Sequence, residues 1–343
     1  MLDEQALNRS VLARQLLLAR APVDIPTALE AMGCLQAQYA PSMYVGLWSR
    51  VVGLQRRVVT RALDNRGAVQ GTLQRATIHL VSRADYWPLA VAVRASRRAW
   101  WLRATRRSLT DADLVRIAER VAAALSEGPL RRTEVEALVG REAAGAIHLW
   151  LDLVRVPPSG TWDRRRADLY GLASSWIPGP EPAAAEALEH LVRRYLVGFG
   201  PASTSDIASW GGLPRSVVTG AVERMGLRRF LATDGTVLVD VPDGPLPEPA
   251  TPAPVRLLPT WDAPLLAHAR RSGVVPERFR PRLFHTKNPQ SVPCFLVDGR
   301  VAGTWAYRGG RVQVEPFGRL DGATRRALTT EAEALTAFHA SSD

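Results

Sequence analysis

The sequence is poor in cysteine and shows no clustering of metal ligands. Its 343 residues hold 2 cysteines, Cys34 and Cys294, which lie far apart. No pairing pattern of a disulfide-stapled scaffold is present. The 6 histidines make no pair at ligand spacing with cysteine or a carboxylate. We therefore expect neither a metal site nor another cofactor.

Long hydrophobic runs are also missing. No segment approaches the roughly 20 apolar residues that a helix needs to span a bilayer. The amino terminus carries Asp3, Glu4 and Asn8 before any apolar stretch, which is not the pattern of a signal peptide. These absences predict a cytoplasmic protein that does not interact with a membrane.

Lysine is almost absent, because Lys287 is the only one in the chain. Lys+Arg total 44 against 33 for Asp+Glu, so the formal net charge of +11 comes almost wholly from arginine. Guanidinium groups bind phosphate bidentately, and a basic surface releases counterions from a duplex. The charge favours a nucleic-acid partner, although by itself it also fits a role in solubility.

The middle of the chain contains an internal repeat. Matching segments begin at Gly128-Pro129 and at Gly200-Pro201, 72 residues apart. Each follows a helical stretch, which the glycine–proline pair ends. The next helix is expected to be capped by Thr133 in the first copy and by Ser205 in the second, or by a neighbour of either. A third helical stretch and then a hairpin pattern follow in both copies. This order is typical of a winged-helix module; the alternative is two unrelated helical hairpins with chance turns.

The remaining segments complete an α+β architecture. The first hundred residues look like a divergent third copy, with helices over 6–20 and 25–35 and a strand over 77–81. Short β segments at 292–297, 300–307 and 311–314 precede a terminal helix over 323–338. We therefore expect three tandem winged-helix modules and a small C-terminal antiparallel β-barrel. The predicted divisions are 1–108, 109–180 and 181–241 for the modules, 242–259 for a proline-rich linker, and 260–343 for the barrel domain.

One short loop carries candidate chemistry. Gln36 and Gln38 are two apart at the end of a predicted helix, and Pro41 follows them. This spacing can place both carboxamides in one small volume. Taken alone, the pattern is more typical of glutamines that are solvated or that cap a carbonyl.

The residues around this loop resemble a known family. Residues 34–38, Cys-Leu-Gln-Ala-Gln, together with Tyr-Val-Gly-Leu-Trp at 44–48, look like the catalytic segment of the AlkZ-type DNA glycosylases. These are winged-helix proteins associated with protection against DNA-alkylating antibiotics. The likeness continues through residues 77–82 and 199–202 to 301–305 and 314–317, so it covers nearly the whole chain.

The resemblance implies a C-shaped DNA clamp of three winged-helix units and a C-terminal barrel. It also implies excision of N7-alkylated purines, including bulky adducts and interstrand crosslinks. By that likeness, Gln36 and Gln38 match the glutamine–x–glutamine motif of the family. One departure is Trp261-Asp262-Ala263-Pro264, which stands where the family usually has phenylalanine-aspartate-asparagine. A DNA contact by that asparagine is therefore in doubt here.

The chemistry of glutamine suits such a reaction. A carboxamide is no general base, but an N7-alkylguanine is already cationic and needs little help to leave. Two carboxamide oxygens can hold a water near C1′ and offer their dipoles to an oxocarbenium-like sugar. A lyase would need an amine to form a Schiff base, and the chain offers only Lys287 and its N-terminus. We therefore predict a monofunctional glycosylase that leaves an abasic site.

Basic residues near these features are candidate DNA contacts, although each also fits a solvated role or, for His79, a core role. The candidates are Arg75, His79, Arg83, Arg165, Arg308 and Lys287. Because the repeats lie within one chain, we expect a monomer. Its expected partner is double-stranded DNA with alkylated purines, so we also expect it to be associated with the nucleoid. The alternative is a non-catalytic winged-helix transcriptional regulator, which would normally be a dimer reading two half-sites.

Overall fold

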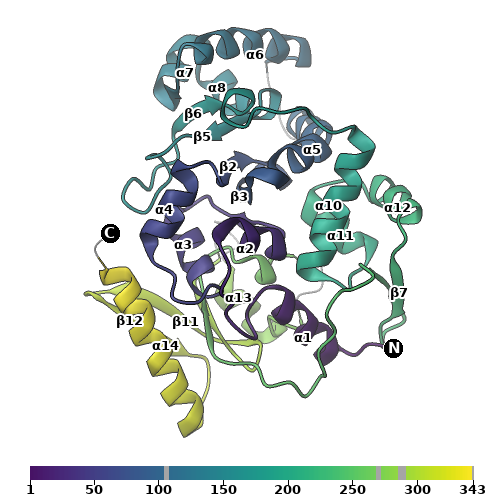
Figure 1. The fold of residues 1–343 in the computed structure, drawn as a ribbon, viewed down its shortest axis with the longest axis vertical. Coiled ribbons are helices and arrows are strands. Elements are labelled where there is room, and N and C mark those ends of the chain that lie inside the picture. Colours follow the sequence, from purple (N-terminus) through teal and green to yellow (C-terminus); the bar gives the residue numbers. More distant parts are fainter. Residues whose placement is uncertain (104–107, 268–271, 285–290, 342–343) are drawn as a thin grey trace.

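The computed structural model describes residues 1–103, 108–267, 272–284 and 291–341, so Lys287 lies outside the described residues. Over these residues the chain is a mixed α+β protein with three antiparallel sheets of six, four and two strands. Figure 1 shows α6, α7 and α8 at one end of the molecule, and α14 with β12 at the other. None of the helices in the described ranges combines the length and the apolar character that a bilayer crossing requires.

The N-terminal helices are shorter than the hydrophobic spacing predicts. The first ends at Arg14 instead of residue 20, and Leu16 then takes a φ of 55°. The second ends at Met32, because Gly33 adopts a φ of 81° and turns the chain. Leu35 is thereby released from the helix into a short strand. The elements are α1 (Glu4–Arg14), α2 (Ile25–Met32), β1 (Leu35–Gln36), α3 (Ala40–Trp48) and α4 (Arg56–Asp64).

A six-stranded sheet joins the first hundred residues to the first repeat copy. Its order is β1-β3-β2-β5-β6-β4, and every described pair is antiparallel. One face of the sheet packs on α5 and on α10 (Ala184–Phe199). On the opposite face, β1, β2 and β3 pack on α2, α3 and α4. The strands are β2 (Ala68–Thr72), β3 (Ile78–Ser82), β4 (Leu130–Arg131), β5 (Leu153–Arg155) and β6 (Leu169–Leu172). The turn η1 (Gln74–Ala76) precedes β3, and α5 (Arg83–Arg103) follows it.

The sequence repeat corresponds to a repeated order of elements. Its second helices begin at Arg132 and Thr204, so they keep the spacing of 72 residues. Ser203, a neighbour of Ser205, caps the second of them by accepting a hydrogen bond from the Asp206 amide at 3.2 Å. In both copies three helices precede a two-stranded hairpin, as predicted. The first has α6 (Asp111–Ser126), α7 (Arg132–Val139), α8 (Arg141–Trp150), β5 and β6; the short α9 (Ala173–Trp176) follows. The second has α10 (Ala184–Phe199), α11 (Thr204–Gly211), α12 (Arg215–Arg224), β7 (Arg228–Leu231) and β8 (Val237–Asp240).

The C-terminal strands form an open sheet among the described residues. Their order is β12-β11-β10-β9, so β12 and β9 are edges, and a closed barrel is not confirmed. Helix α14 covers the sheet instead, because its Leu335 and Phe338 share a core with Trp305 and Val312. The elements are β9 (Arg256–Leu258), η2 (Ala263–Leu265), η3 (Glu277–Phe279), α13 (Arg280–Leu283), β10 (Cys294–Val297), β11 (Arg300–Arg308), β12 (Arg311–Pro316) and α14 (Gly322–Ala340). β9 lies inside the proline-rich segment 242–259, at a sheet edge where proline-rich sequence is tolerated.

Two buried ion pairs connect distant segments to the N-terminal helices. The Arg14 guanidinium binds Asp240, at the end of β8, with Nη2 and Oδ2 2.7 Å apart. Arg50, after α3, binds Asp262 through both terminal nitrogens, at 2.7 and 2.9 Å. The side chains of Arg50 and Asp262 are 0% exposed. Each charge is therefore compensated by its partner instead of by water.

We expect Asp262→Ala to lower the free energy of unfolding by about 3 kcal/mol or more, because it leaves the buried Arg50 charge without its carboxylate. Urea denaturation measures this change. The matched control is Glu136→Ala, which breaks the more exposed pair with Arg132 and should cost under about 1 kcal/mol. Equal losses in the two variants would contradict the role given to Asp262.

Candidate active site

The glutamine loop, residues 33–41, is held against the edge of the six-stranded sheet. Leu35 faces Leu80 and Gln36 faces His79 across the β1–β3 ladder. The Ala37 amide then donates to the Ile78 carbonyl at 2.7 Å. A Cβ on Gly33 would lie 3.0 Å from the Arg194 carbonyl oxygen, and its φ of 81° also favours glycine. Glycine at this position therefore permits the turn that directs Gln36 onto the sheet edge.

The two carboxamides lie together, as their spacing predicts. Gln36 is half-buried at the end of β1, and Gln38 is exposed. The Gln36 Nε2 donates to Gln38 Oε1 at 2.7 Å. Because one amide proton of Gln36 is used in this way, the orientation of its carbonyl oxygen is set by Gln38.

His79 lies opposite Gln36 across the β1–β3 ladder and is a neutral side chain. It is 1% exposed, and its Nδ1 is 3.0 Å from the Thr77 carbonyl oxygen. A carbonyl can only accept, so Nδ1 carries the proton and Nε2 is the acceptor. Burial, helped by the positive charge of Arg75, lowers the pKa of His79 to about 3. His79 is thus an uncharged support of the loop in the free protein, and its contact with DNA remains a prediction.

Arg75 lies near the loop, and Cys34 belongs to it. Arg75 has a φ of 53° in η1, and its Nη1 donates to the Trp210 carbonyl of α11. Its guanidinium therefore links the sheet to the second repeat copy. Burial raises the pKa of the Cys34 thiol to about 12, so this side chain stays neutral. No group of three or more histidine, cysteine, aspartate or glutamate side chains is placed to hold a metal ion within the described ranges.

Of the predicted arginine contacts, Arg165 reaches the glutamine loop directly. It lies in the loop between β5 and β6, and its Nη1 donates to the Tyr39 hydroxyl at 3.2 Å. The sequence interpretation did not single out Tyr39, although its position directly after Gln38 was an available signal. The structure therefore brings one arginine from the first repeat copy to the edge of the candidate site.

The other predicted contacts are placed elsewhere. Arg83 is exposed and is the first residue of α5, directly after β3 ends at Ser82. Arg308 is exposed and is the last residue of β11. It faces Arg311, the first residue of β12, across the turn. Contact of either residue with DNA remains a prediction.

The Trp261-Asp262-Ala263 segment has a packing role in the free protein. Asp262 holds Arg50, as described above, and Ala263 is 9% exposed within the core shared with α5 and α10. The position where the resemblance suggested asparagine therefore carries a buried methyl group. The sequence interpretation did not anticipate the buried bond to Arg50.

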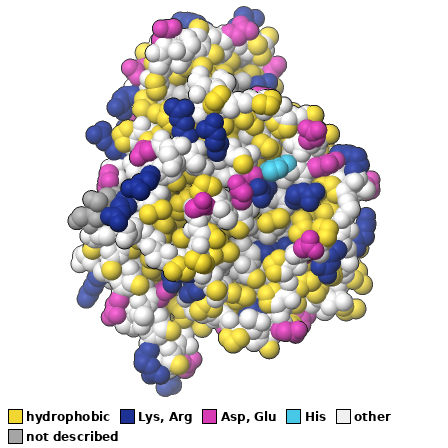
Figure 2. Space-filling view, in the orientation of Figure 1, with side chains coloured by type: hydrophobic (Ala, Val, Ile, Leu, Met, Phe, Trp, Pro, Cys, Tyr) yellow, Lys and Arg dark blue, Asp and Glu magenta, His cyan; other side chains and the backbone are white. Residues whose placement is uncertain are grey.

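Surface charge alone does not locate the site. Figure 2 shows arginine side chains scattered among acidic and apolar ones on this face, without one continuous basic stripe. On this face, the arrangement of charge therefore does not mark a DNA-binding surface.

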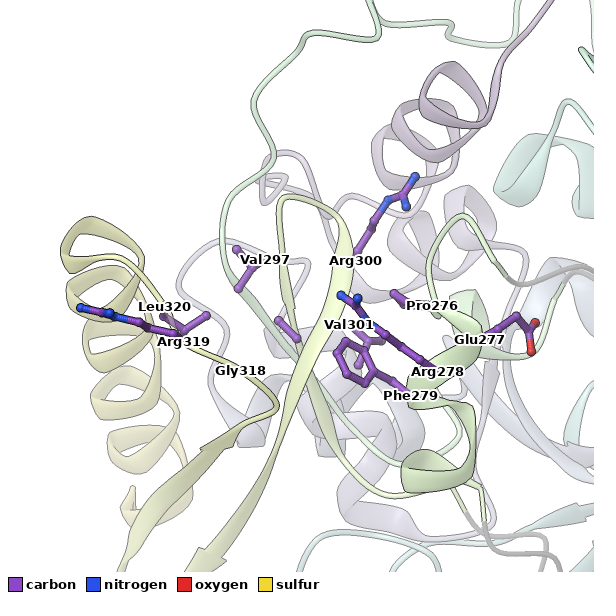
Figure 3. Close-up of a pocket in the computed structure, with 11 residues that line it drawn as sticks. Pro276, Glu277, Arg278, Phe279, Val297, Arg300, Val301, Gly318, Arg319 and Leu320 are labelled. Carbon is purple, nitrogen blue, oxygen red and sulfur yellow. The ribbon is translucent and has the colours of Figure 1, made fainter.

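A separate hollow lies in the C-terminal segment (Figure 3), with a volume of about 630 Å³. Arg278, Arg300 and Arg319 line it together with apolar side chains such as Val301. Arg300 is already paired with Glu4 at 3.0 Å, and Arg278 lies over the Phe279 ring at 4.7 Å. This hollow contains no residue of the glutamine loop.

Comparisons with known proteins define the class. The family model described as "DNA glycosylase AlkZ-like" matches residues 29–338. The chain therefore belongs to the AlkZ-like DNA glycosylase family, whose members hydrolyse N-glycosyl bonds in DNA. The solved structure of the DNA glycosylase AlkZ from Streptomyces sahachiroi is similar, with 20% identity and a TM-score of 0.83 over 98% of this chain and 96% of that chain. This likeness shows a shared fold. A comparison with curated proteins finds no match.

The buried neutral state of His79 makes stability depend on pH. Its pKa falls from 6.5 to about 3 on folding, so below pH 6.5 the unfolded chain binds a proton that the folded chain does not. Stability should fall as the pH falls, by about 2 kcal/mol between pH 7 and 5 from this residue.

We therefore expect His79→Gln to reduce the loss of unfolding free energy between pH 7 and 5 by that amount. Urea denaturation at both pH values measures it. The control Ile78→Val, in the same strand, introduces no change in titration and should keep the wild-type pH dependence. The same pH dependence in His79→Gln would contradict the buried neutral state.

Proposed function

We propose that the glutamine loop hydrolyses the N-glycosidic bond of cationic N7-alkylated purines in duplex DNA and leaves an abasic site. The observation that carries this proposal is the hydrogen bond between Gln36 Nε2 and Gln38 Oε1, which joins two carboxamides at the sheet edge of a DNA glycosylase. Bulky adducts and interstrand crosslinks belong to the same chemical class, since they too are N7-alkylated cations. Such an activity would protect a cell against a DNA-alkylating toxin.

The reaction needs little proton transfer. The alkylated purine leaves as a neutral base, because it already carries the positive charge that protonation would supply. The sugar then bears the developing charge in an oxocarbenium-like transition state. The carbonyl oxygens of Gln36 and Gln38 stabilise this charge and hold the water that attacks C1′. As its oxygen bonds to C1′, this water loses a proton to bulk solvent, because neither carboxamide can take it. A normal purine is neutral and would need an acid to leave, so the same site spares it.

The surroundings of the loop suit a charged lesion. Gln36, Gln38 and the buried His79 and Cys34 are all uncharged near neutral pH. These four groups do not repel a cationic base, whereas a protonated histidine there would add to the positive charge of the nearby Arg75 and Arg165. The carboxamide oxygens can therefore act on the positive charge of the transition state.

The architecture supports a clamp around the duplex. The order of three helices and a hairpin in residues 109–180 and 181–241 is that of winged-helix modules, and we assign residues 1–108 as a third module. Residues 242–259 then connect them to the C-terminal domain, 260–343. In this arrangement, residues 156–168 are the wing of the second module, and Arg165 carries that wing to the glutamine loop. One chain supplies all modules, so the proposed enzyme acts as a monomer.

The direct test is excision from a duplex with a single N7-methylguanine, followed by hot alkali. The wild type should give strand scission at that base. Gln36→Ala and Gln38→Ala should each slow scission about 100-fold, because each removes an oxygen that stabilises the transition state. The control Gln313→Ala changes an exposed glutamine on β12 and should keep the wild-type rate.

The outcomes separate the parts of the proposal. If the wild type causes no scission at this base or at bulkier N7 adducts, the proposed glycosylase activity on cationic purines is contradicted. Full activity in both glutamine variants would overturn only the assignment of the site. Strand breaks in reactions without alkali would overturn the monofunctional mechanism.

A further inference from the structure

Tyr39 is an exposed aromatic residue in an otherwise buried stretch. Its side chain is 42% exposed, whereas all nine residues of the following helix α3 are buried. Tyr39 also occupies the N-cap position of α3, but its side chain makes no capping hydrogen bond among the described residues. Neither core packing nor capping accounts for an aromatic side chain directly after Gln38.

The position of this ring is nevertheless restrained. Arg165 Nη1 donates to the Tyr39 hydroxyl at 3.2 Å, and Arg165 Nε donates to the Trp162 carbonyl at 3.3 Å. Trp162 is itself buried and packs edge-on against Tyr44 of α3, with 5.6 Å between the ring centroids. The Tyr39 hydroxyl is therefore bonded to Arg165, an exposed residue that in turn bonds to the backbone of the buried Trp162.

A fixed and exposed aromatic ring is suited to one kind of ligand. An aromatic face attracts cations through its quadrupole, and every nucleobase can stack on it. An N7-alkylated purine is both a cation and a flat base. Because the ring is already held in place, little conformational freedom is lost when a base stacks on it.

We propose that the cationic base stacks on the Tyr39 ring while Gln36 and Gln38 act at its sugar, and that Arg165 positions this ring. This inference rests on the proposed function and adds a selectivity element to it. The ring distinguishes a cationic adduct from a neutral purine at the binding step, before any bond is broken.

The experiment measures binding without cleavage. Each Tyr39 variant is made in a Gln38→Ala background, and its Kd is measured for an undamaged duplex and for the same duplex with one N7-methylguanine. The quantity of interest is the ratio of the two Kd values, since contacts to the DNA backbone affect both equally. Tyr39→Leu should reduce the preference for the methylated duplex about tenfold. Tyr39→Phe keeps the ring and should stay within about threefold of the background protein.

A matched control and a coupling test complete the design. Trp100→Leu removes another exposed aromatic residue, 53% exposed on α5, and should leave the ratio unchanged. Arg165→Gln should lower the ratio only as far as Tyr39→Phe does, because both remove the same hydrogen bond, and it should have no further effect in Tyr39→Leu. An unchanged ratio in Tyr39→Leu, or equal losses in the Phe and Leu variants, would overturn the stacking role. Failure of the wild type to release any base would instead contradict the proposed function. The ratio of the two Kd values would still test the role of Tyr39.

Discussion

The pairing of β1 with β3 is the interaction on which the candidate site depends. Only Leu35 and Gln36 form this strand, yet their register with Leu80 and His79 sets the direction of the glutamine loop. The ladder continues through β2, β5, β6 and β4 into the first repeat copy. The loop that carries the glutamines and the hairpin that carries Arg165 are therefore parts of one hydrogen-bonded sheet. This continuity explains how Arg165 reaches Tyr39.

The second constraint is electrostatic. The sheet edge under the loop is made of side chains that burial keeps neutral, above all His79, whose pKa falls to about 3. Arg75 stays charged nearby and donates to the Trp210 carbonyl, and Arg165 donates to the Tyr39 hydroxyl. Uncharged carboxamides with oriented carbonyl oxygens suit a cationic leaving group, since stabilisation has to be directed at the sugar. The absence of a titrating base at the loop is thus compatible with hydrolysis.

Local patterns predicted much of the fold. Turn signals such as Gly128-Pro129 and Gly200-Pro201 marked the repeat, and short β segments were predicted at 292–297, 300–307 and 311–314. The early end of α2 was not predicted, because it depends on the left-handed conformation of Gly33 beside the Arg194 carbonyl. The proximity of Gln36 and Gln38 followed from their spacing, and it is present in the structure.

Contacts between distant residues could not be predicted from such patterns. Arg165 and Tyr39 are 126 positions apart, and Arg50 and Asp262 are 212 apart. The six-stranded sheet could not be predicted either. Its strands come from two segments that the sequence pattern assigns to different modules, with the boundary at residue 108. Pairing between them depends on the packed cores on its two faces, which a linear pattern does not specify.

A double-mutant cycle on the two glutamines tests the central claim most directly. Single-turnover release of N7-methylguanine would be compared among the wild type, Gln36→Ala, Gln38→Ala and the double variant. If the carboxamides act as one hydrogen-bonded unit, the double variant should be about as slow as the slower single variant. Losses that multiply in the double variant, or no loss in any of them, would contradict the account.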